Sequence, residues 1–252
     1  MNETITADSD TAAFARQELL NWFKTSARAF PWRHDHDPYH VLIAEMMLRR
    51  TQARQVVAVY QRFLHLYPDI HHLDQAPAEE VASVLYPLGL AWRAVNFKLL
   101  AHEIVTRHNG MVPREREALL ALTGVGSYVA EAVRCFAFNE PAVIVDTNTV
   151  RVAARYFGFT YNAESRRRKP VIHAVGCLVD EQQPASSNYA LLDFAAVVCS
   201  AQKPEHTHCP LAACCAYYRK ARQQTTSFTT ASGNTILEEG EERLAYEGDD
   251  IC

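Results

Sequence analysis

The sequence predicts an almost entirely α-helical protein, for three reasons. Apolar residues recur at helical spacing in several stretches, for example at Val56, Tyr60 and Phe63. The alternation of polar and apolar residues that is typical of strands is scarce. Short segments containing proline or glycine separate the helical stretches, which leaves no long internal linker.

These breaks divide the apolar pattern into an ordered series of helices. They occur at Phe30-Pro31, Asp37-Pro38, Tyr67-Pro68, Tyr86-Pro87, Asn109-Gly110 and Gly124-Val125-Gly126. We expect helices at about residues 11–27, 40–66, 78–86, 91–109, 115–121, 127–138, 148–157, 169–183 and 187–199. From about residue 225 the chain is rich in Thr, Ser, Gly and acidic residues and has no apolar period, so we expect a flexible tail.

Length and composition limit the type of protein. With 252 residues, of which 48% are hydrophobic and 21% charged, the chain can form one large or two small domains. No apolar run approaches the roughly 20 residues needed to span a bilayer, and the N-terminus has no secretion-signal pattern. The cytoplasm, or the nucleoid within it, is the expected compartment. There, four cysteines between Cys199 and Cys215 indicate a metal site rather than disulfides.

The formal net charge of −4 is unevenly distributed along the chain. Residues 225–252 carry a net charge of −6, so the remainder carries +2. Two basic runs, Arg49-Arg50 and 166–169, can contact phosphates, although a solvated surface explains them equally well. The low total charge therefore does not exclude a nucleic-acid partner.

Two glycines lie in the short segment Leu122-Thr123-Gly124-Val125-Gly126, between two expected helices. They permit a tight turn whose backbone N–H groups point outward at a helix N-terminus. Such a turn binds a phosphate without reading the base sequence. An ordinary turn between helices is the alternative.

Two carboxylates are candidates for catalysis. Asp146 lies at the expected start of a helix, where it is either an N-cap or a fixed charge beside a reacting sugar. A carboxylate in the second role stabilises positive charge on the sugar ring or activates water when a glycosidic bond breaks. Glu45 lies among apolar residues, which predicts a raised pKa and hydrogen bonding or proton donation to a leaving base. A solvent-facing helix position is the alternative for Glu45.

A group of soft metal ligands follows the last expected helix. It consists of Cys199, Cys209, Cys214 and Cys215, with His206 and His208 between them. These residues exceed the number that one metal site needs. Unrelated buried thiols are the alternative.

In this order, these elements resemble the helix-hairpin-helix DNA glycosylases with a Gly/Pro-rich loop and a catalytic Asp, the HhH-GPD superfamily of endonuclease III and the adenine glycosylase MutY. The resemblance runs from about Phe30 to Tyr218. Phe30-Pro31-Trp32-Arg33, Asp37-Pro38-Tyr39 and the segment from Glu45 to Thr51 are most similar to the thymine/uracil mismatch glycosylases, which act on G·T and G·U pairs. Adenine glycosylases usually have paired glutamines in place of Arg49-Arg50.

The resemblance implies an all-α, two-lobed helical fold with a metal-cluster loop near the C-terminus. It divides the chain into a flexible N-terminus at 1–10, a catalytic unit at 11–224 and an acidic flexible tail at 225–252. Within the catalytic unit, a lobe at about 30–138 contains the hairpin, and residues 11–29 plus 139–224 form the cluster-bearing lobe. We expect a monomer that binds double-stranded DNA, because base flipping requires no symmetry.

The resemblance also assigns roles to the candidate residues. Asp146 is the catalytic carboxylate, and Glu45 acts at the flipped base. Tyr128 lines the base pocket or contacts the sugar; bifunctional relatives have a lysine there, and adenine glycosylases usually a serine. A phenol cannot form the imine needed for strand cleavage, so water is the expected nucleophile and the strand stays intact. The residues implied to contact DNA are Arg49, Arg50, Leu88, Gly124, Val125 and Gly126.

Two of these DNA contacts concern the gap that a flipped base leaves in the stack. Arg50 and Leu88 match the positions whose side chains fill that gap. A phosphate contact for Arg50 and a core position for Leu88 are the alternatives.

The superfamily's iron–sulfur loop has four cysteines spaced C-x6-C-x2-C-x5-C. Counted from Cys199, that spacing falls on His206, Cys209 and Cys215, so one cysteine is replaced by histidine. The resemblance implies a 4Fe-4S cluster, altered or labile, held by these four residues. Replacement of His206 by another nearby donor, His208 or Cys214, and a zinc site are alternatives.

The predicted function is that of a monofunctional DNA glycosylase of base excision repair, which hydrolyses the N-glycosidic bond of T or U opposite G. Two departures accompany it: Thr123 stands where the hairpin usually has proline, and the short acidic segment replaces the domain that adenine glycosylases append to recognise 8-oxoguanine. Excision of adenine from A·G or A·8-oxoguanine, or of a modified pyrimidine in phage defence, is the alternative enzymatic function. A DNA-binding or redox-sensing module without catalysis is the alternative from another class.

Overall fold

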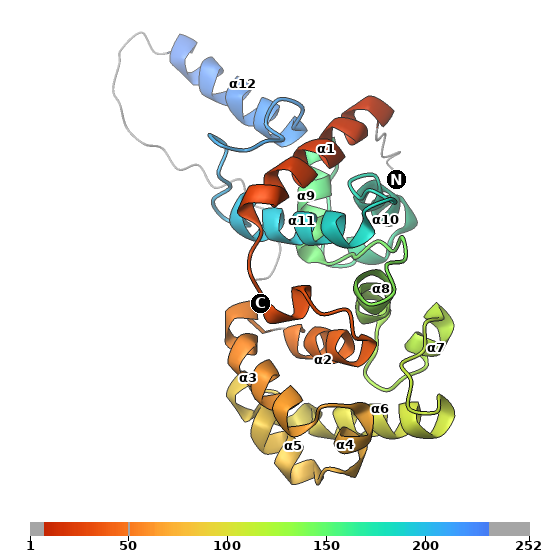
Figure 1. Ribbon diagram of the computed structural model, residues 1–252. Helices are drawn as coiled ribbons and strands as arrows, with labels where there is room; N and C mark the ends of the chain where they lie inside the picture. Colours follow the sequence, from red (N-terminus) through yellow and green to blue (C-terminus); the bar gives the residue numbers. More distant parts are fainter. Residues whose placement is uncertain (1–7, 50, 232–252) are drawn as a thin grey trace. The chain divides into compact units, whose positions relative to one another are not determined.

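The computed structural model describes residues 8–49 and 51–231. Within these residues, all regular secondary structure is α-helix or 3-10 helix and no strand occurs, which confirms the predicted fold class (Figure 1). The described chain divides into two compact units. One comprises residues 28–144, and the other comprises residues 8–27 and 145–231.

The unit of residues 28–144 contains the helices that precede the hairpin and the hairpin itself. Its α-helices are α2 (Pro38–Leu48), α3 (Ala53–Leu66), α4 (Ile70–Gln75), α5 (Ala78–Leu85), α6 (Ala94–Arg107), α7 (Arg116–Leu120) and α8 (Ser127–Phe136). Its 3-10 turns are η1 (Pro31–Arg33), η2 (Tyr86–Leu88) and η3 (Ala91–Arg93). Helix α2 packs against α3 and α8, and α6 packs against α4 and α5. Because α2 is buried from Tyr39 to Met47 except at His40, it forms the centre of this unit.

Aspartate side chains start two of these helices. Asp37 accepts hydrogen bonds from the backbone N–H groups of Tyr39 and His40, and Pro38 occupies the first helical position of α2. Asp69 accepts in the same way at the start of α4. Both patterns satisfy N–H groups that have no partner within the helix.

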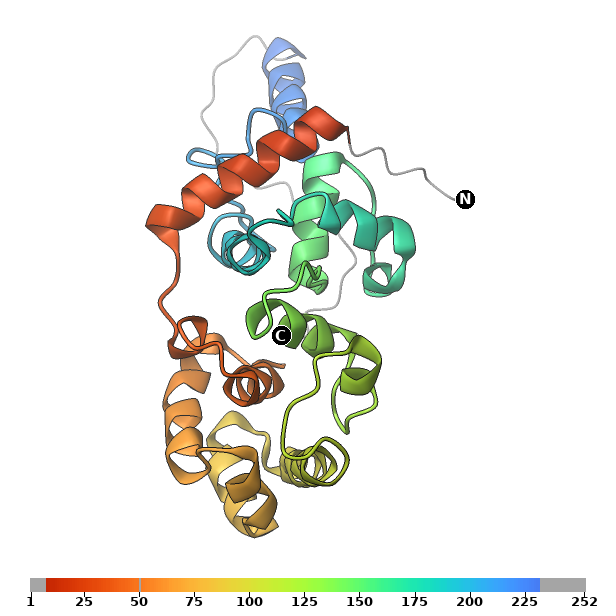
Figure 2. The same ribbon diagram turned by 45° about the vertical axis from the view of Figure 1, so that its right-hand side comes forward.

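The other unit is arranged around α9 (Thr147–Phe157), whose residues from Thr149 to Tyr156 are all buried. Helices α10 (Lys169–Gly176), α11 (Pro184–Val197) and α12 (Ala216–Ala231) all pack against α9, and α1 (Ser9–Ser26) packs on α11. The 3-10 turn η4 (Ser165–Arg167) precedes α10. Figure 2 shows α1 lying across the other helices of this unit. The loop between α11 and α12 carries the group of cysteines and histidines.

Several predicted helix boundaries differ from the structure. The single helix expected at 40–66 is two helices, separated at 49–52, where Arg49 and Gln52 adopt extended backbone angles. Helix α10 ends at Gly176 instead of residue 183, because Asp180 accepts hydrogen bonds from the N–H groups of Gln182 and Gln183 and turns the chain before α11. Helices α4 and α12 were not predicted.

The chain ends also differ in part from expectation. Helix α1 begins at Ser9, within the N-terminal segment expected to be flexible. Helix α12 runs to Ala231, into the segment expected to be a flexible tail, and residues 232–252 lie outside the described part of the chain. Among the described helices, none has both the length and the apolar character to cross a membrane.

Candidate functional site

Asp146 is the N-cap of α9 and is held by several hydrogen bonds. Its Oδ1 accepts from the backbone N–H groups of Asn148 at 2.8 Å and Thr149 at 2.7 Å. Its Oδ2 accepts from the side-chain amide of Asn148 at 2.8 Å. The backbone N–H of Asp146 donates in return to the hydroxyl of Thr149, which completes a capping box. The carboxylate is half-buried and its N–H donors complement a negative charge.

A chain of side chains connects Asp146 to the start of the cysteine-containing loop. Arg151 donates from Nη1 to Oδ1 of Asn148 at 2.9 Å, and Asn148 in turn donates to Asp146. The same guanidinium donates to the backbone carbonyls of Cys199 at 3.0 Å and Ala195 at 2.9 Å. Arg151 is 7% exposed, and burial lowers the pKa of its guanidinium. Asn148 and Arg151 therefore fix the orientation of Asp146; sequence analysis missed this role of both residues.

Glu45 lies in the other unit, on α2. Its side chain is only 3% exposed, which is the buried position that the surrounding apolar residues suggested. The alternative of a solvent-facing helix position is therefore wrong. Water competes less for a carboxyl group in a buried position. Such a group can therefore form a hydrogen bond with, or transfer a proton to, a buried partner.

The hairpin between α7 and α8 has the expected tight turn. Gly124 has φ +81°, a left-handed conformation that glycine adopts without strain, and a Cβ at this position would lie 2.9 Å from Cε of Met46. The N–H of Val125 is used inside the turn, where it donates to the carbonyl of Leu122 at 3.1 Å. Gly126 is exposed, and a Cβ there would meet nothing within 4 Å. Of the predicted phosphate contacts, Gly126 at the N-terminus of α8 thus has the most accessible backbone.

Thr123, which stands where the hairpin usually has proline, forms two hydrogen bonds that proline could not form. Its backbone N–H donates to Oε2 of Glu103 on α6 at 2.7 Å, and its hydroxyl donates to Oε1 of the same side chain at 2.9 Å. A proline at this position has no N–H and could make neither bond. In this chain, the hairpin is therefore tied to α6 by a polar clamp. The sequence gives no local signal for this pair.

Arg49 links the segment after α2 to the hairpin. It donates from Nη1 to the carbonyl of Gly124 at 2.6 Å, and its own carbonyl accepts from Nη1 of buried Arg93 at 3.1 Å. The structure thus brings together two of the residues predicted to contact DNA, Arg49 and Gly124.

The remaining predicted residues of this unit are Tyr128, Leu88 and Arg50. Tyr128 is half-buried in the first turn of α8. Leu88 is half-buried at the end of η2, beside Tyr86, which is 76% exposed. Arg50 lies outside the described residues.

The four predicted cluster ligands line one cavity of the other unit. Cys199, His206, Cys209 and Cys215 surround it together with Arg155 and Tyr217. Burial raises the pKa of the Cys209 thiol to about 11, and the neighbouring thiols of Cys215 and Cys199 add to this shift. Burial also raises the pKa of the Cys215 thiol. Bound positive charge favours the thiolate and lowers the pKa of such thiols.

Arg155 lies at the same cavity. Its Nη1 and Nη2 donate to the carbonyls of Ser200 at 2.6 Å and Ala201 at 2.7 Å, and Nη1 lies 3.5 Å from the sulfur of Cys199. Its Nε–H is buried and has no hydrogen-bond partner within the protein. An N–H group of this kind beside three thiols fits a site for a sulfide-containing cluster, whose sulfurs accept hydrogen bonds.

A site for a single metal ion requires donors that all converge on one point. Among the described residues, no group of three or more His, Cys, Asp or Glu side chains is arranged to hold one ion. A 4Fe-4S cluster uses more widely spaced donors, because each donor binds a different iron.

Comparison with known proteins shows which family the chain resembles. The family model of the HhH-GPD superfamily base excision DNA repair protein matches residues 43–170. The thymine/uracil-DNA glycosylase of Methanothermobacter thermautotrophicus is 38% identical over 203 residues, which cover 80% of this chain and 92% of that protein. Adenine DNA glycosylases are also similar; that of Mus musculus is 31% identical, and the match covers 92% of this chain but 46% of the mouse protein.

Solved structures of DNA glycosylases and of endonuclease III have a fold similar to that of this chain. A thermostable thymine-DNA glycosylase superposes with a TM-score of 0.80 at 36% identity, covering 84% of this chain and 98% of that one. Endonuclease III in a trapped covalent intermediate with DNA superposes with a TM-score of 0.73 at 25% identity, covering 86% of this chain and all of that one. The chain therefore belongs to the HhH-GPD superfamily of base excision DNA repair proteins.

Proposed function

We propose that this protein is a monofunctional DNA glycosylase that removes thymine or uracil mispaired with guanine. The observation that carries the proposal is the 38% identity to a thymine/uracil-DNA glycosylase along 92% of the length of that relative. The match to the adenine DNA glycosylase of the mouse covers 46% of the length of that protein, at a lower identity of 31%. DNA is the expected partner, and the cytoplasm at the nucleoid the expected location.

Asp146 is the proposed catalytic carboxylate. When the glycosidic bond breaks, positive charge develops on the sugar ring, and a fixed carboxylate stabilises that charge or takes a proton from the attacking water. The hydrogen bonds from Asn148 and Thr149 occupy Oδ1 twice and Oδ2 once. They hold the carboxylate in one orientation before the substrate arrives, so no binding energy is needed to order it.

The departing pyrimidine requires a second group. Expulsion of a base leaves negative charge on its ring, and a proton or hydrogen bond from the protein reduces that charge. Glu45 is proposed for this role, because it is the buried acid of α2. Tyr128, in the first turn of α8, is proposed to line the pocket for the flipped base or to contact the sugar.

Tyr128 also determines the proposed product. A lysine amine at this position could attack the sugar and form an imine, which leads to strand cleavage by β-elimination, whereas a phenol cannot. With water as nucleophile, the products are the free base and an abasic site in an intact strand.

DNA contact is proposed through both the hairpin and the neighbouring segments. The N-terminus of α8, beginning at the exposed Gly126, offers backbone N–H groups and the positive end of a helix to a phosphate. Arg49 supports the turn through the carbonyl of Gly124. Arg50 and Leu88 are proposed to fill the base stack after flipping.

The loop between α11 and α12 is proposed to hold a 4Fe-4S cluster. Cys199, Cys209 and Cys215 would bind it together with a fourth donor of the same loop, since the three thiols line one cavity that Arg155 also lines. The cluster would supply structural order to this loop and is not required for hydrolysis.

The test uses end-labelled duplexes that contain G·T, G·U, A·G or A·8-oxoguanine, with and without an alkaline step. We expect cleavage of the pyrimidine-containing strand of G·T or G·U only after alkali, and no cleavage by an Asp146→Asn variant. Excision confined to adenine would instead assign the protein to the adenine class. Activity on none of the four duplexes would refute the proposal in favour of modified-base excision or a non-catalytic role.

A further inference from the structure

The loop between α11 and α12 contains more possible cluster ligands than a cluster uses. Besides three thiols, either histidine or a fourth thiol could complete the site. We propose that the imidazole of His206 is the fourth ligand, so that the cluster is bound by three thiolates and one histidine. This inference rests on the proposal that the chain binds a 4Fe-4S cluster.

The first argument is that His206 shares one cavity with the three thiols. Cys199, Cys209 and Cys215 line this cavity together with His206. Arg155 contacts two of these thiols, since its Nη1 lies 3.5 Å from Sγ of Cys199 and its carbonyl lies 3.5 Å from Sγ of Cys215. His206 is therefore the histidine of this loop that already lines the cavity of the three thiols.

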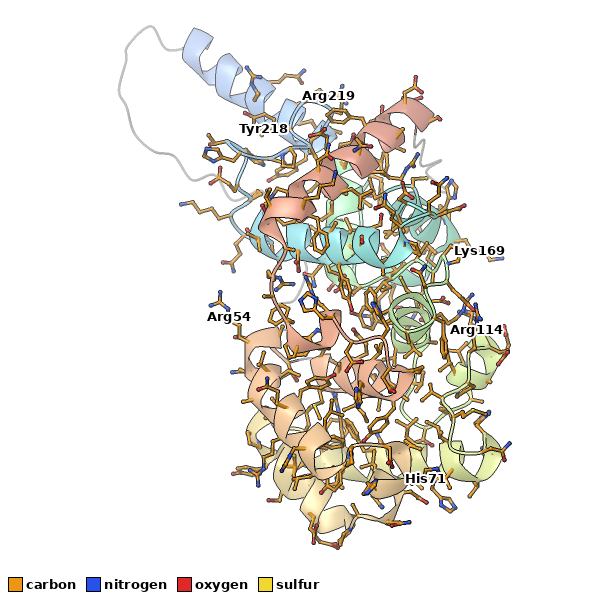
Figure 3. All side chains as sticks on the ribbon, viewed as in Figure 1. Arg54, His71, Arg114, Lys169, Tyr218 and Arg219 are labelled. Carbon is orange, nitrogen blue, oxygen red and sulfur yellow. The ribbon has the colours of Figure 1, made fainter. Side chains whose placement is uncertain are left out.

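The second argument is that the imidazole is held in place. Its ring centroid lies 4.8 Å from that of Tyr218 and 5.9 Å from that of Tyr217. Both tyrosines belong to the first turn of α12, where Tyr218 is labelled in Figure 3. The half-buried imidazole thus has neighbours that restrict its rotamers, which lowers the entropy lost on binding a metal.

The third argument is that neither competing donor faces this cavity. The His208 side chain is 85% exposed, and its Nδ1 lies 4.0 Å from the carboxylate of Glu205. Cys214 does not line the cavity, although its neighbour Cys215 does. His208 or Cys214 could replace His206 only if the loop refolded.

A histidine ligand in place of a cysteine changes the charge of the cluster and its reduction potential. A neutral imidazole in place of a thiolate makes the bound cluster one unit less negative. Since a less negative cluster accepts an electron more readily, its reduction potential is higher than that of the same cluster with four thiolates.

The test is spectroscopic and uses the full chain, purified and reconstituted with iron and sulfide without oxygen. After reduction with dithionite, pulsed electron paramagnetic resonance should detect a strongly coupled nitrogen, which changes from the ¹⁴N to the ¹⁵N pattern when the protein contains ¹⁵N-histidine. His206→Cys should keep the iron and sulfide content, lose the nitrogen coupling and lower the reduction potential. His208→Ala is the matched control and should retain the coupling.

The possible outcomes test three claims separately: that His206 is a ligand, that the chain binds the cluster, and that it excises a base. If the cluster shows no coupling to histidine nitrogen, His206 is not a ligand. The same conclusion follows if iron is lost in Cys214→Ser but kept in His206→Ala. Neither result contradicts the presence of the cluster. Failure to bind iron and sulfide in a 4:4 ratio overturns the cluster and its ligand together. Base excision by the same preparations is measured separately, so it tests the proposed function alone.

Discussion

At the scale of single residues, Asp146 has one observed role and one proposed role. It caps α9 through Oδ1, and it is the proposed catalytic carboxylate. Asparagine caps a helix about as well as aspartate, since its side-chain oxygen accepts the same hydrogen bonds. Asparagine carries no charge, however, and cannot stabilise a cationic sugar or accept a proton from water. This difference allows the structural role to be measured apart from the catalytic one.

We expect Asp146→Asn to reduce single-turnover excision by about 100-fold or more, because a catalytic charge is lost. Its free energy of unfolding, measured by urea denaturation, should fall by less than that of Asp146→Ala, which loses the cap at a cost of about 1 kcal/mol. Duplex binding by both variants serves as the control for folding. If Asp146→Asn excises at the normal rate, Asp146 is only an N-cap.

Asn148 is the residue through which Arg151 positions Asp146. We expect Asn148→Ala to slow single-turnover excision by roughly 5-fold, because loss of one hydrogen bond of about 1 kcal/mol leaves Oδ2 of Asp146 free to turn. The dissociation constant for the duplex should change little. Thr147→Ala, at the exposed neighbouring position, is the matched control. Equal effects of the two substitutions would show that Asn148 has no positioning role.

At the scale of elements, the hairpin depends on a contact with a helix that is distant in sequence. The two bonds from Thr123 to Glu103 join the turn between α7 and α8 to α6. The guanidinium of Arg49 reaches the same turn from the segment after α2. The backbone that is proposed to bind phosphate is thus held from two sides.

Substitutions at Thr123 test this clamp. We expect Thr123→Val to lower the free energy of unfolding by about 1–2 kcal/mol, because one oxygen of the half-buried Glu103 loses its donor. Thr123→Pro should cost more, since it removes the donor N–H as well. Thr123→Ser keeps both donors and is the control. The measurement is urea denaturation, and a Thr123→Pro variant as stable as the wild type would contradict the clamp.

At the scale of the whole molecule, the proposed catalytic groups belong to both units. Asp146 and the cluster-binding loop are part of the unit that contains α9, whereas Glu45, Tyr128 and the hairpin are part of the other. Net charge is also divided, since residues 225–252 carry −6 and the rest of the chain +2. The acidic segment therefore opposes the approach of DNA through long-range repulsion.

Removal of residues 232–252, which contain all of this excess negative charge, should increase affinity for duplex DNA several-fold at about 50 mM salt. The increase should vanish at about 500 mM salt, where repulsion is screened. Fluorescence anisotropy with a labelled duplex measures both. A neutral segment of the same length, with Ser and Gln in place of the acids, should behave like the truncation; if it behaves like the wild type, charge is not the cause.

The sequence predicted most helices because their apolar period and their capping residues are local. The break between α2 and α3 was missed because residues 49–52 contain neither proline nor glycine. That break is stabilised by Arg93, which donates to the carbonyl of Arg49 from a distant element. The apolar period does not mark the end of α10, because apolar residues continue from Cys177 to Val179 after Gly176.

The sequence by itself determined the all-α fold, the family and the identity of the candidate residues, because residue type, periodicity and motif spacing are written along the chain. Only the tertiary structure decided how these residues are supported: the bonds from Arg151, which holds Asn148, to the carbonyls of Cys199 and Ala195, the Thr123 clamp and the shared cavity of His206 with three thiols. The bonds of Arg151 to these carbonyls and of Thr123 to Glu103 join residues that helix packing brings together, and no local pattern encodes such a pairing.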